Sequence, residues 1–326
     1  MMSTLVTTLL MAVIYLAIVR FADMNEKEPL WAMLLFFVGG AALAALLRVV
    51  APPDLELTVL PAAAAKELAR FLAIGAGVAV LAVIGQIRGW HDFNGTMDGV
   101  VYGTTAGLGF GTGERVLQEL VVGTLSVPGV EVGLFSGFGR AALGGLAHGV
   151  FGAIAGAGIG AAADTRSPVL RALLPVIGLF SAILAHAGYL VLGRGNALSG
   201  TEGLVRSWAA LLLPVVVIAV VIFWALARER KAIRTQLADE VNAGTVTSDD
   251  LALLGNAVRR ELAYMKLRLG FKLGALSSLK ALHNRQVQLA FTKDQASRES
   301  DPERRSRLDA EIDKLRSAIA GARGAR

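Results

Sequence analysis

Hydrophobic residues fill the first two thirds of the chain in seven stretches, each long enough to cross a bilayer. A membrane-spanning helix needs about 20 mainly apolar residues. The stretches lie at residues 3–21, 30–50, 60–87, 97–121, 140–163, 169–193 and 204–227. This pattern predicts an all-α fold, a polytopic membrane helix bundle of about seven transmembrane helices. The first stretch lacks a basic segment and a small-residue cleavage site, so we expect it to be retained as a span.

After residue 227 the continuous apolar pattern gives way to an amphipathic one. Residues 247–250, Thr-Ser-Asp-Asp, are typical of a helix start, and apolar residues follow at helical spacing: Leu251, Leu254, Val258, Leu262, Met265 and Leu269. A second amphipathic stretch keeps heptad-like spacing: Leu308, Ile312, Leu315 and Ile319. We therefore predict a transmembrane helical domain at 1–227 and a basic, helical cytoplasmic tail at 228–326. Two heptads leave a coiled coil, a membrane-surface helix and a helical hairpin open. His283 is expected to be a solvated surface residue.

Composition agrees with a membrane protein and places the positive charge in the tail. The chain is 54% hydrophobic and only 18% charged, which lies outside the soluble globular range. It has no cysteine, which excludes disulfides, thiol catalysis and cysteine-ligated metals. Residues 1–227 hold 12 Lys/Arg and 13 Asp/Glu, whereas 228–326 hold 20 and 13, so net charges of −1 and +7 give the total of +6. Such a tail favours anionic lipid as a partner, and no nucleic acid is expected.

Basic residues also predict the orientation of the spans. Arg228, Arg230, Lys231 and Arg234 follow the last span and place the C-terminus in the cytoplasm. With seven spans the N-terminus is then outside. The long loop 122–139, which is external in this topology, contains no Lys or Arg.

Four of the predicted spans carry an ionisable residue where hydrocarbon is expected. At 1.5 Å per residue they lie at a similar depth, roughly 10 Å below the outer surface: Glu67, Glu114, His148 and His186. Ionisable groups in lipid are costly and are functional candidates by default. Arg70 follows Glu67 by one turn and is expected to pair with Glu67 or Glu114. Lys66 is expected to extend to the outer surface.

Glycine spacing predicts that two of these residues meet. Glycines recur every four residues in the fourth span and lead to Glu114: Gly99, Gly103, Gly107 and Gly111. A similar ridge in the fifth span includes His148: Gly144, Gly152, Gly156 and Gly160. Small residues let helix backbones approach closely in a membrane. Helices packed along these ridges would bring Glu114 and His148 to a shared centre.

In order and spacing, five segments resemble the motifs of the PrsW family of intramembrane proteases, distant relatives of the CAAX prenyl-endopeptidases. The segments are FADMNEKEPLW (21–31), AKELARFLAI (65–74), MDGVVYGTTAGLGFGTGERV (97–116), RAALGGLAHGVFGAIAGAGIG (140–160) and LAHAGYL (184–190).

The resemblance implies an endopeptidase of the inner membrane of a prokaryote. Its expected substrate is a single-span, membrane-anchored regulatory protein such as an anti-sigma factor, cut near the outer leaflet. The positions that match as catalytic are Glu67, Glu114, His148 and His186, with Arg70 in support. Two mechanisms stay open. Glutamate and histidine could activate water directly, or His148, His186 and Glu114 could hold a divalent metal such as zinc.

Departures from the family pattern keep a second function open. Lys66 stands where the family has the first glutamate of a pair, and Leu190 stands where an asparagine is usual. A catalytically inactive relative that binds membrane segments as a scaffold or regulator is therefore the alternative. A transporter is less favoured, because the sequence shows no internal repeat or broken helix pair. A homo-oligomer is left open.

Overall fold

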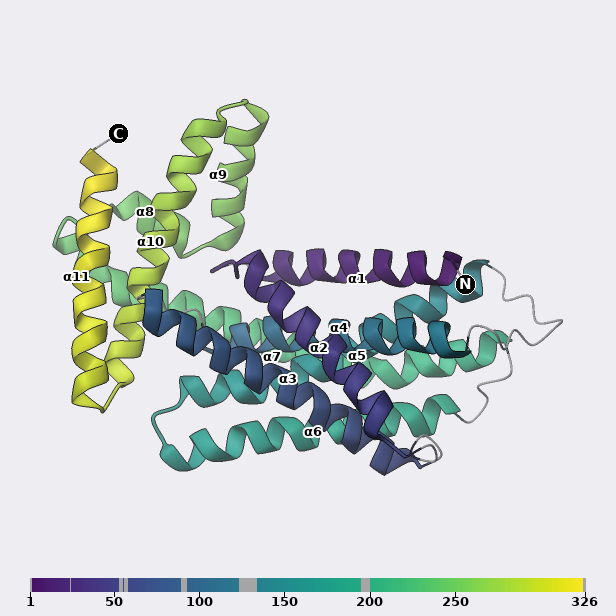
Figure 1. Ribbon diagram of the computed structural model, residues 1–326. Helices are drawn as coiled ribbons and strands as arrows, with labels where there is room; N and C mark the ends of the chain where they lie inside the picture. The colour runs from purple at the N-terminus through teal and green to yellow at the C-terminus, as the bar shows by residue number, and fades with distance from the viewer. Residues whose placement is uncertain are drawn as a thin grey trace. The chain divides into compact units, whose positions relative to one another are not determined.

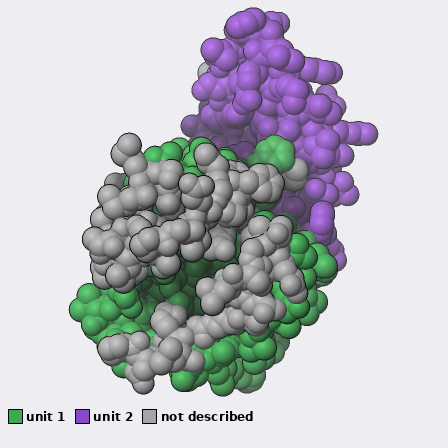
Figure 2. Space-filling view, turned by 90° about the vertical axis from the view of Figure 1, so that its right-hand side faces the viewer, with its two compact units in different colours: residues 1–22, 28–222 green, residues 23–27, 223–326 purple. Residues whose placement is uncertain are grey.

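The computed structural model describes residues 2–23, 25–52, 55, 58–88, 93–122, 134–194 and 200–324, which form helices and no strand (Figure 1). They fall into two compact units. Unit 1 comprises residues 1–22 and 28–222, and unit 2 comprises 23–27 and 223–326 (Figure 2). The units divide between residues 222 and 223, inside a helix and close to the end of the last apolar stretch.

All seven predicted spans are helical, so the predicted all-α bundle is confirmed. The helices are α1 (Met2–Ala22), α2 (Leu30–Val50), α3 (Val59–Arg88), α4 (Thr96–Val122), α5 (Leu134–Asp164), α6 (Pro168–Arg194) and α7 (Gly200–Asn242). Among the described residues, five helices are long and apolar enough to cross a membrane; α4 is not one of them, and the apolar part of α1 is shorter. Seven crossings therefore stay a prediction, as does the orientation. Residues 123–133, in the loop used to orient the chain, lie outside the described residues.

Helix α4 is polar for a membrane helix because other helices surround it. It packs against α1, α2, α3 and α5. Between Thr96 and Phe110 every residue except Thr104 is buried. Neighbouring helices thus shield from lipid the Thr, Asp and Tyr side chains that lower its hydropathy.

Glycines set the distance between α4 and α5, as the ridges predicted, except at Gly144, which meets nothing within 4 Å. A Cβ atom on Gly103 would overlap the carbonyl oxygen of Gly152, and one on Gly152 would overlap that of Gly103. Nearer to the site, a Cβ atom on Gly107 would overlap the carbonyl oxygen of His148. The backbones therefore touch, and this contact places His148 beside the middle of α4, at Gly107 and Gly111.

Helix α7 continues past the apolar stretch and enters unit 2. From Val205 to Asn242 it holds 38 residues, about 57 Å at 1.5 Å per residue, which is nearly twice the hydrocarbon thickness. Only the apolar part, up to residue 227, fits within a bilayer. The residues after it are mostly Arg, Lys, Ala, Glu, Gln and Leu, which favour a helix in water.

Unit 2 is a helical domain with its own core. After α7 it contains α8 (Ser248–Leu254), α9 (Ala257–Leu269), α10 (Leu273–Arg298) and α11 (Pro302–Gly324). Helices α10 and α11 pack together, so the helical hairpin is the alternative that the structure adopts here. The four residues with heptad-like spacing are all in the core: Leu308, Ile312, Leu315 and Ile319.

Two expectations for the tail were wrong. The apolar spacing from Leu251 to Leu269 does not form one helix, because the chain breaks at Gly255 and Asn256 caps α9 by accepting a hydrogen bond from the Arg259 amide at 3.1 Å. His283 is not solvated but 1% exposed. Its Nδ1 lies 2.9 Å from the Tyr264 hydroxyl, because α9 packs over α10.

The contact between α4 and α5 predicts a position-specific effect of one added methyl group. Gly152→Ala should destabilise the protein by about 1–3 kcal/mol, because the methyl group overlaps backbone atoms of α4. Gly144→Ala on the same helix meets nothing within 4 Å and should not destabilise. Thermal unfolding of both variants in detergent measures the difference. Equal melting temperatures would contradict the close contact.

The charge network of Glu240 predicts a pH-dependent stability of unit 2. Glu240, beyond the apolar part of α7, accepts hydrogen bonds from Lys293 at 2.7 Å and Arg316 at 2.6 Å. Burial raises the pKa of Glu240, but the bonds from Arg316 and Lys293 outweigh it and lower the pKa from 4.5 to about 2. Because the folded-state pKa is depressed, the stabilisation is complete above pH 4.5 and is lost as the pH falls towards 2.

Glu240→Gln should therefore lower the stability of unit 2 by about 2 kcal/mol at pH 7, with a difference that shrinks below pH 4.5. Hydrogen exchange of the α11 amides in the full-length protein, corrected for intrinsic rates, measures this. Glu311→Gln, which removes a looser pair with Lys314 at 3.4 Å, is the matched control and should cost less than about 1 kcal/mol. A Glu240→Gln effect that is constant with pH would refute the charge explanation.

Candidate functional site

Four helices of unit 1 bring the predicted site residues into one network. Helix α3 contributes Lys66, Glu67 and Arg70, while α4, α5 and α6 contribute Glu114, His148 and His186. Consecutive members of the network contact each other in the order Lys66, Glu114, His148, Arg70, Glu67, His186.

A buried ion pair forms the inner half of this network. Glu67 and Arg70 are both fully buried, and their i,i+3 spacing places them on one face of α3. One terminal nitrogen of Arg70 donates to Oε1 of Glu67 and the other contacts Nδ1 of His148. The ring of Phe110 lies 4.4 Å from the guanidinium carbon, a cation–π contact. Arg70 was expected to pair with Glu67 or Glu114; it pairs with Glu67 and reaches His148 instead of Glu114.

These contacts determine which nitrogen of each histidine carries a proton. Arginine donates but never accepts, so Nδ1 of His148 accepts and the proton of the neutral ring is on Nε2. His186 Nδ1 lies 2.7 Å from the Glu67 carboxylate and donates to it, so Nε2 of the neutral His186 ring carries a lone pair. Phe151 stacks on His186 with ring centres 4.8 Å apart, which fixes the plane of the imidazole.

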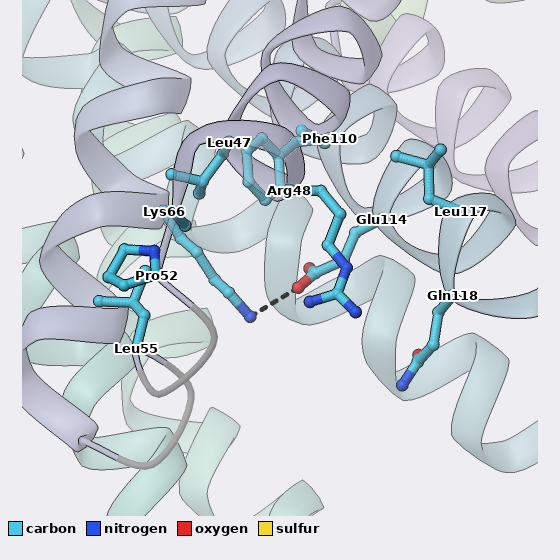
Figure 3. A pocket seen from close by; sticks show the side chains of 11 residues that line it. Leu47, Arg48, Pro52, Leu55, Lys66, Phe110, Glu114, Leu117 and Gln118 are labelled. Atoms are coloured by element: carbon cyan, nitrogen blue, oxygen red, sulfur yellow. Dashed lines mark ion pairs between the residues drawn. The ribbon is translucent and has the colours of Figure 1, made fainter. Parts of the chain in front are cut away.

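Lys66 and Glu114 form the outer half of the network (Figure 3). Lys66 Nζ lies 2.5 Å from Glu114 Oε1, and Glu114 Oε2 lies 3.3 Å from His148 Nε2. The expectation that Lys66 extends to the outer surface was wrong, because its side chain is only 11% exposed. A carboxylate within reach satisfies its charge inside the protein. The predicted meeting of Glu114 and His148 is confirmed.

Two cavities meet the outer half of the network but not the inner half. One, of about 230 Å³, is lined by Lys66, Glu114, His148 and His186 together with Gln118 and other residues. The other, of about 400 Å³, also includes Lys66, Glu114 and Gln118, and its walls combine apolar side chains with the charged side chain of Arg48 (Figure 3). Glu67 and Arg70 line neither cavity. Glu114 and His148, whose side chains are 30% and 17% exposed, are therefore accessible to a small molecule, whereas His186 is only 3% exposed and Glu67 is fully buried.

Sequence reasoning did not single out the two phenylalanines that shape the site. Phe110 lies one turn before Glu114, and Phe151 lies three residues after His148. Helical spacing from each predicted site residue was the signal that could have identified them.

The acidic segment at 21–31 contacts a different part of α4. Its Glu28 accepts a hydrogen bond from Tyr102, twelve residues before Glu114 on α4, about 18 Å along the helix axis. Glu28 is therefore not part of the network described above.

The arrangement does not fit a metal ion among the predicted ligands. Within the described residues, no three His, Asp or Glu side chains are close enough to hold one. His148 and His186 face each other edge-on with ring centres 6.1 Å apart. Among the predicted ligands, His148 has its Nδ1 occupied by the contact with Arg70, so that nitrogen is not free to bind a metal ion. One oxygen of Glu67, Oε2, is buried without a hydrogen-bond partner.

Comparison with known proteins identifies the family. Neither a curated protein nor a solved structure matches the chain. A family model described as PrsW family intramembrane metalloprotease matches residues 28–226, more than half of the 326-residue chain. This range begins at Glu28 and contains all six residues of the network. The chain therefore belongs to the PrsW family of intramembrane proteases.

Proposed function

We propose that the protein is an intramembrane endopeptidase that hydrolyses a peptide bond with Glu114 and His148 as its central catalytic pair. The observation that carries the proposal is that the accessible carboxylate and imidazole lie 3.3 Å apart at the wall of a cavity, inside the helix bundle of unit 1. An apolar pair would stabilise helices in lipid better than these ionisable side chains do, so the pair is a functional candidate. The proposed chemistry runs through these side chains, because the donor set does not fit the family's metal.

In this mechanism Glu114 is the general base. It takes a proton from a water molecule as the oxygen attacks the carbonyl carbon. The negative charge that develops on the carbonyl oxygen is stabilised by the proton on His148 Nε2 and by the ammonium group of Lys66. The proton held by Glu114 then passes to the nitrogen as the C–N bond breaks. His186, with a lone pair on Nε2, accepts a hydrogen bond that orients the water.

Glu67 and Arg70 act as positioning residues. Arg70 holds His148 in the tautomer with the proton on Nε2, and Glu67 holds His186 in the opposite one. Both side chains are fully buried, so neither meets substrate in this arrangement.

We propose a single-span, membrane-anchored regulatory protein, such as an anti-sigma factor, as the substrate. The cavity of about 400 Å³ supports this choice, because Leu47, Leu55, Phe110 and Leu117 contribute apolar walls next to Glu114. Those walls suit the apolar side chains of a membrane segment beside the cleaved bond. Cleavage near the outer leaflet follows from the predicted topology.

A second function is favoured by the ion pair between Lys66 and Glu114. At 2.5 Å the ammonium group occupies one oxygen of the proposed base, and Leu190 lines the cavity where the family pattern has an amide. A protein with these two changes could bind a membrane segment in the same cavities without cutting it, as a scaffold or regulator.

Glu114→Gln and His148→Ala should each abolish cleavage, because one removes the base and the other a donor to the oxyanion. Terminal-peptide mass spectrometry of membranes from cells expressing each form measures this for any membrane substrate that those cells contain. New termini in or beside membrane segments should depend on the wild-type protein. Gln118→Ala, which alters both cavities but not the network, should retain most of the cleavage.

Identical termini with wild type and both network variants would contradict the peptidase. If the wild type generates no termini but still captures a membrane protein, and His148→Ala captures it equally, the scaffold function is supported instead.

Breaking the buried pair of Glu67 and Arg70 should destabilise the protein more than breaking the accessible pair of Lys66 and Glu114. Arg70→Met should destabilise the protein by about 3–5 kcal/mol, because it leaves the Glu67 carboxylate without its cationic partner in the interior. The double variant Glu67→Gln/Arg70→Met should recover much of this loss. Lys66→Met should cost less, since the Glu114 side chain is 30% exposed. Thermal unfolding of the four proteins tests the ranking, and equal losses for Arg70→Met and Lys66→Met would contradict the division into a buried and an accessible half.

A further inference from the structure

Helix α9 in unit 2 has its polarity reversed relative to a helix on a protein surface. Four apolar side chains, each at least half exposed, form a stripe along it: Val258, Leu262, Met265 and Leu269. The opposite side, which faces the protein, holds Arg260 and Tyr264, both buried. A helix whose outer face met only water would carry polar residues there. The stripe therefore faces something other than water.

The turn after α9 extends this apolar surface. Phe271 is 88% exposed and Leu273 is 62% exposed. Figure 1 shows the turn at the end of the hairpin formed by α9 and the start of α10. We call the stripe together with Phe271 and Leu273 the apolar tip.

Phe271 has an unfavourable backbone conformation, and its exposed side chain makes up little of that cost in water. The Lys272 amide donates to the Leu267 carbonyl at 3.0 Å, and the Phe271 amide donates to the Arg268 carbonyl at 3.1 Å. This is the Schellman pattern, whose left-handed position usually holds glycine. Phe271 occupies it with φ of 56°, which is unfavourable for a bulky residue. A backbone outlier of this kind, with its aromatic ring exposed, is a reason to assign the residue a function.

Cations surround the apolar tip. At 100° per residue, Lys266 lies on one edge of the stripe and Arg268 lies on the other edge, beside Glu261, and Lys272 lies in the turn. The sequence contains no acidic residue between Glu261 and Asp294. An apolar stripe bordered on both sides by basic residues is the pattern of a helix that lies in the interface of an anionic membrane.

We propose that the apolar tip of the α9–α10 hairpin inserts into the interfacial region of an anionic lipid leaflet, with Lys266, Arg268 and Lys272 at the headgroups. The charge pattern favours lipid over an apolar protein groove, because a protein partner would need acidic residues on both sides of the stripe. The chain itself keeps the tip near a bilayer, since α7 links unit 2 covalently to the membrane helices, and a tethered contact forms at high effective concentration.

Contacts on the protein side of α9 keep the stripe facing outward. The Tyr264 hydroxyl lies 2.9 Å from His283 Nδ1, and the ammonium group of Lys280 lies 5.1 Å from the centre of the Tyr264 ring. Burial raises the pKa of Tyr264 to about 12, so the hydroxyl stays protonated near neutral pH. The helix is thus fixed in rotation before it meets lipid.

The absence of cysteine makes a direct test possible. Nitroxide labels are placed at Leu262→Cys or Leu269→Cys in the full-length protein, reconstituted in nanodiscs of neutral lipid or of neutral lipid mixed with phosphatidylglycerol. With anionic lipid, collisions with a water-soluble nickel complex should fall several-fold and collisions with oxygen should rise. A label at Ala310→Cys, on the exposed side of α11, should stay equally accessible to nickel in both.

Removing the positive charges beside the stripe should abolish the shielding of the label by anionic lipid. Lys266→Gln/Arg268→Gln/Lys272→Gln should restore nickel accessibility at Leu269→Cys in anionic nanodiscs. The matched triple Arg304→Gln/Arg305→Gln/Arg307→Gln, which removes the same charge from exposed positions of α11, should leave the label inserted. Two results would overturn the proposal. One is a label that stays open to nickel in anionic lipid; the other is a label that is shielded and immobilised whatever the lipid charge, which would mean that the stripe packs on protein, either this chain or a second copy.

Discussion

The ion pair between Arg70 and Glu67 is the interaction on which the candidate site depends. Taking two charges into a membrane domain costs several kcal/mol each, and the cost is offset only when each charge has partners. Arg70 has Glu67, His148 and the face of Phe110, while Glu67 has Arg70 and His186. Each charge therefore determines the position of a histidine. Because a buried charge without partners is so costly, the contacts of Arg70 and Glu67 are strongly favoured, and they hold the site rigid.

Glycine residues allow Glu114 and His148 to come into contact. The side chains of Glu114 and His148 are short, so they meet only if the backbones of α4 and α5 are in contact. Gly103 and Gly152 permit that contact, since neither position has room for a Cβ atom. Packing and chemistry are thus linked: the ridge that holds the two helices together also sets the distance of 3.3 Å between the proposed base and its donor.

Much of the membrane domain could be predicted from the sequence, because lipid leaves few choices. Apolar length gives the helices, and the cost of burying charge selects Glu67, Glu114, His148 and His186. What could not be predicted was how the charges pair. From sequence, Lys66 was expected to extend to the outer surface, and only the position of α4 shows that Glu114 is its partner. Likewise the pattern from Leu251 to Leu269 could not reveal the break at Gly255, nor that α9 buries Tyr264 and exposes Leu262.

In both units the exposed side chains match the expected surroundings, which are hydrocarbon for unit 1 and water for unit 2. In unit 1, polar side chains turn inward because the expected surroundings are hydrocarbon, and the exposed surface carries Leu, Val and Phe. In unit 2, the core is apolar and the surface of α11 is charged, as water requires. Helix α9 follows the first pattern inside the second unit: Arg260 and Tyr264 face the protein, while Leu262 and Leu269 face outward. A segment of a water-facing domain that is built like a membrane helix is most simply explained by contact with the membrane itself.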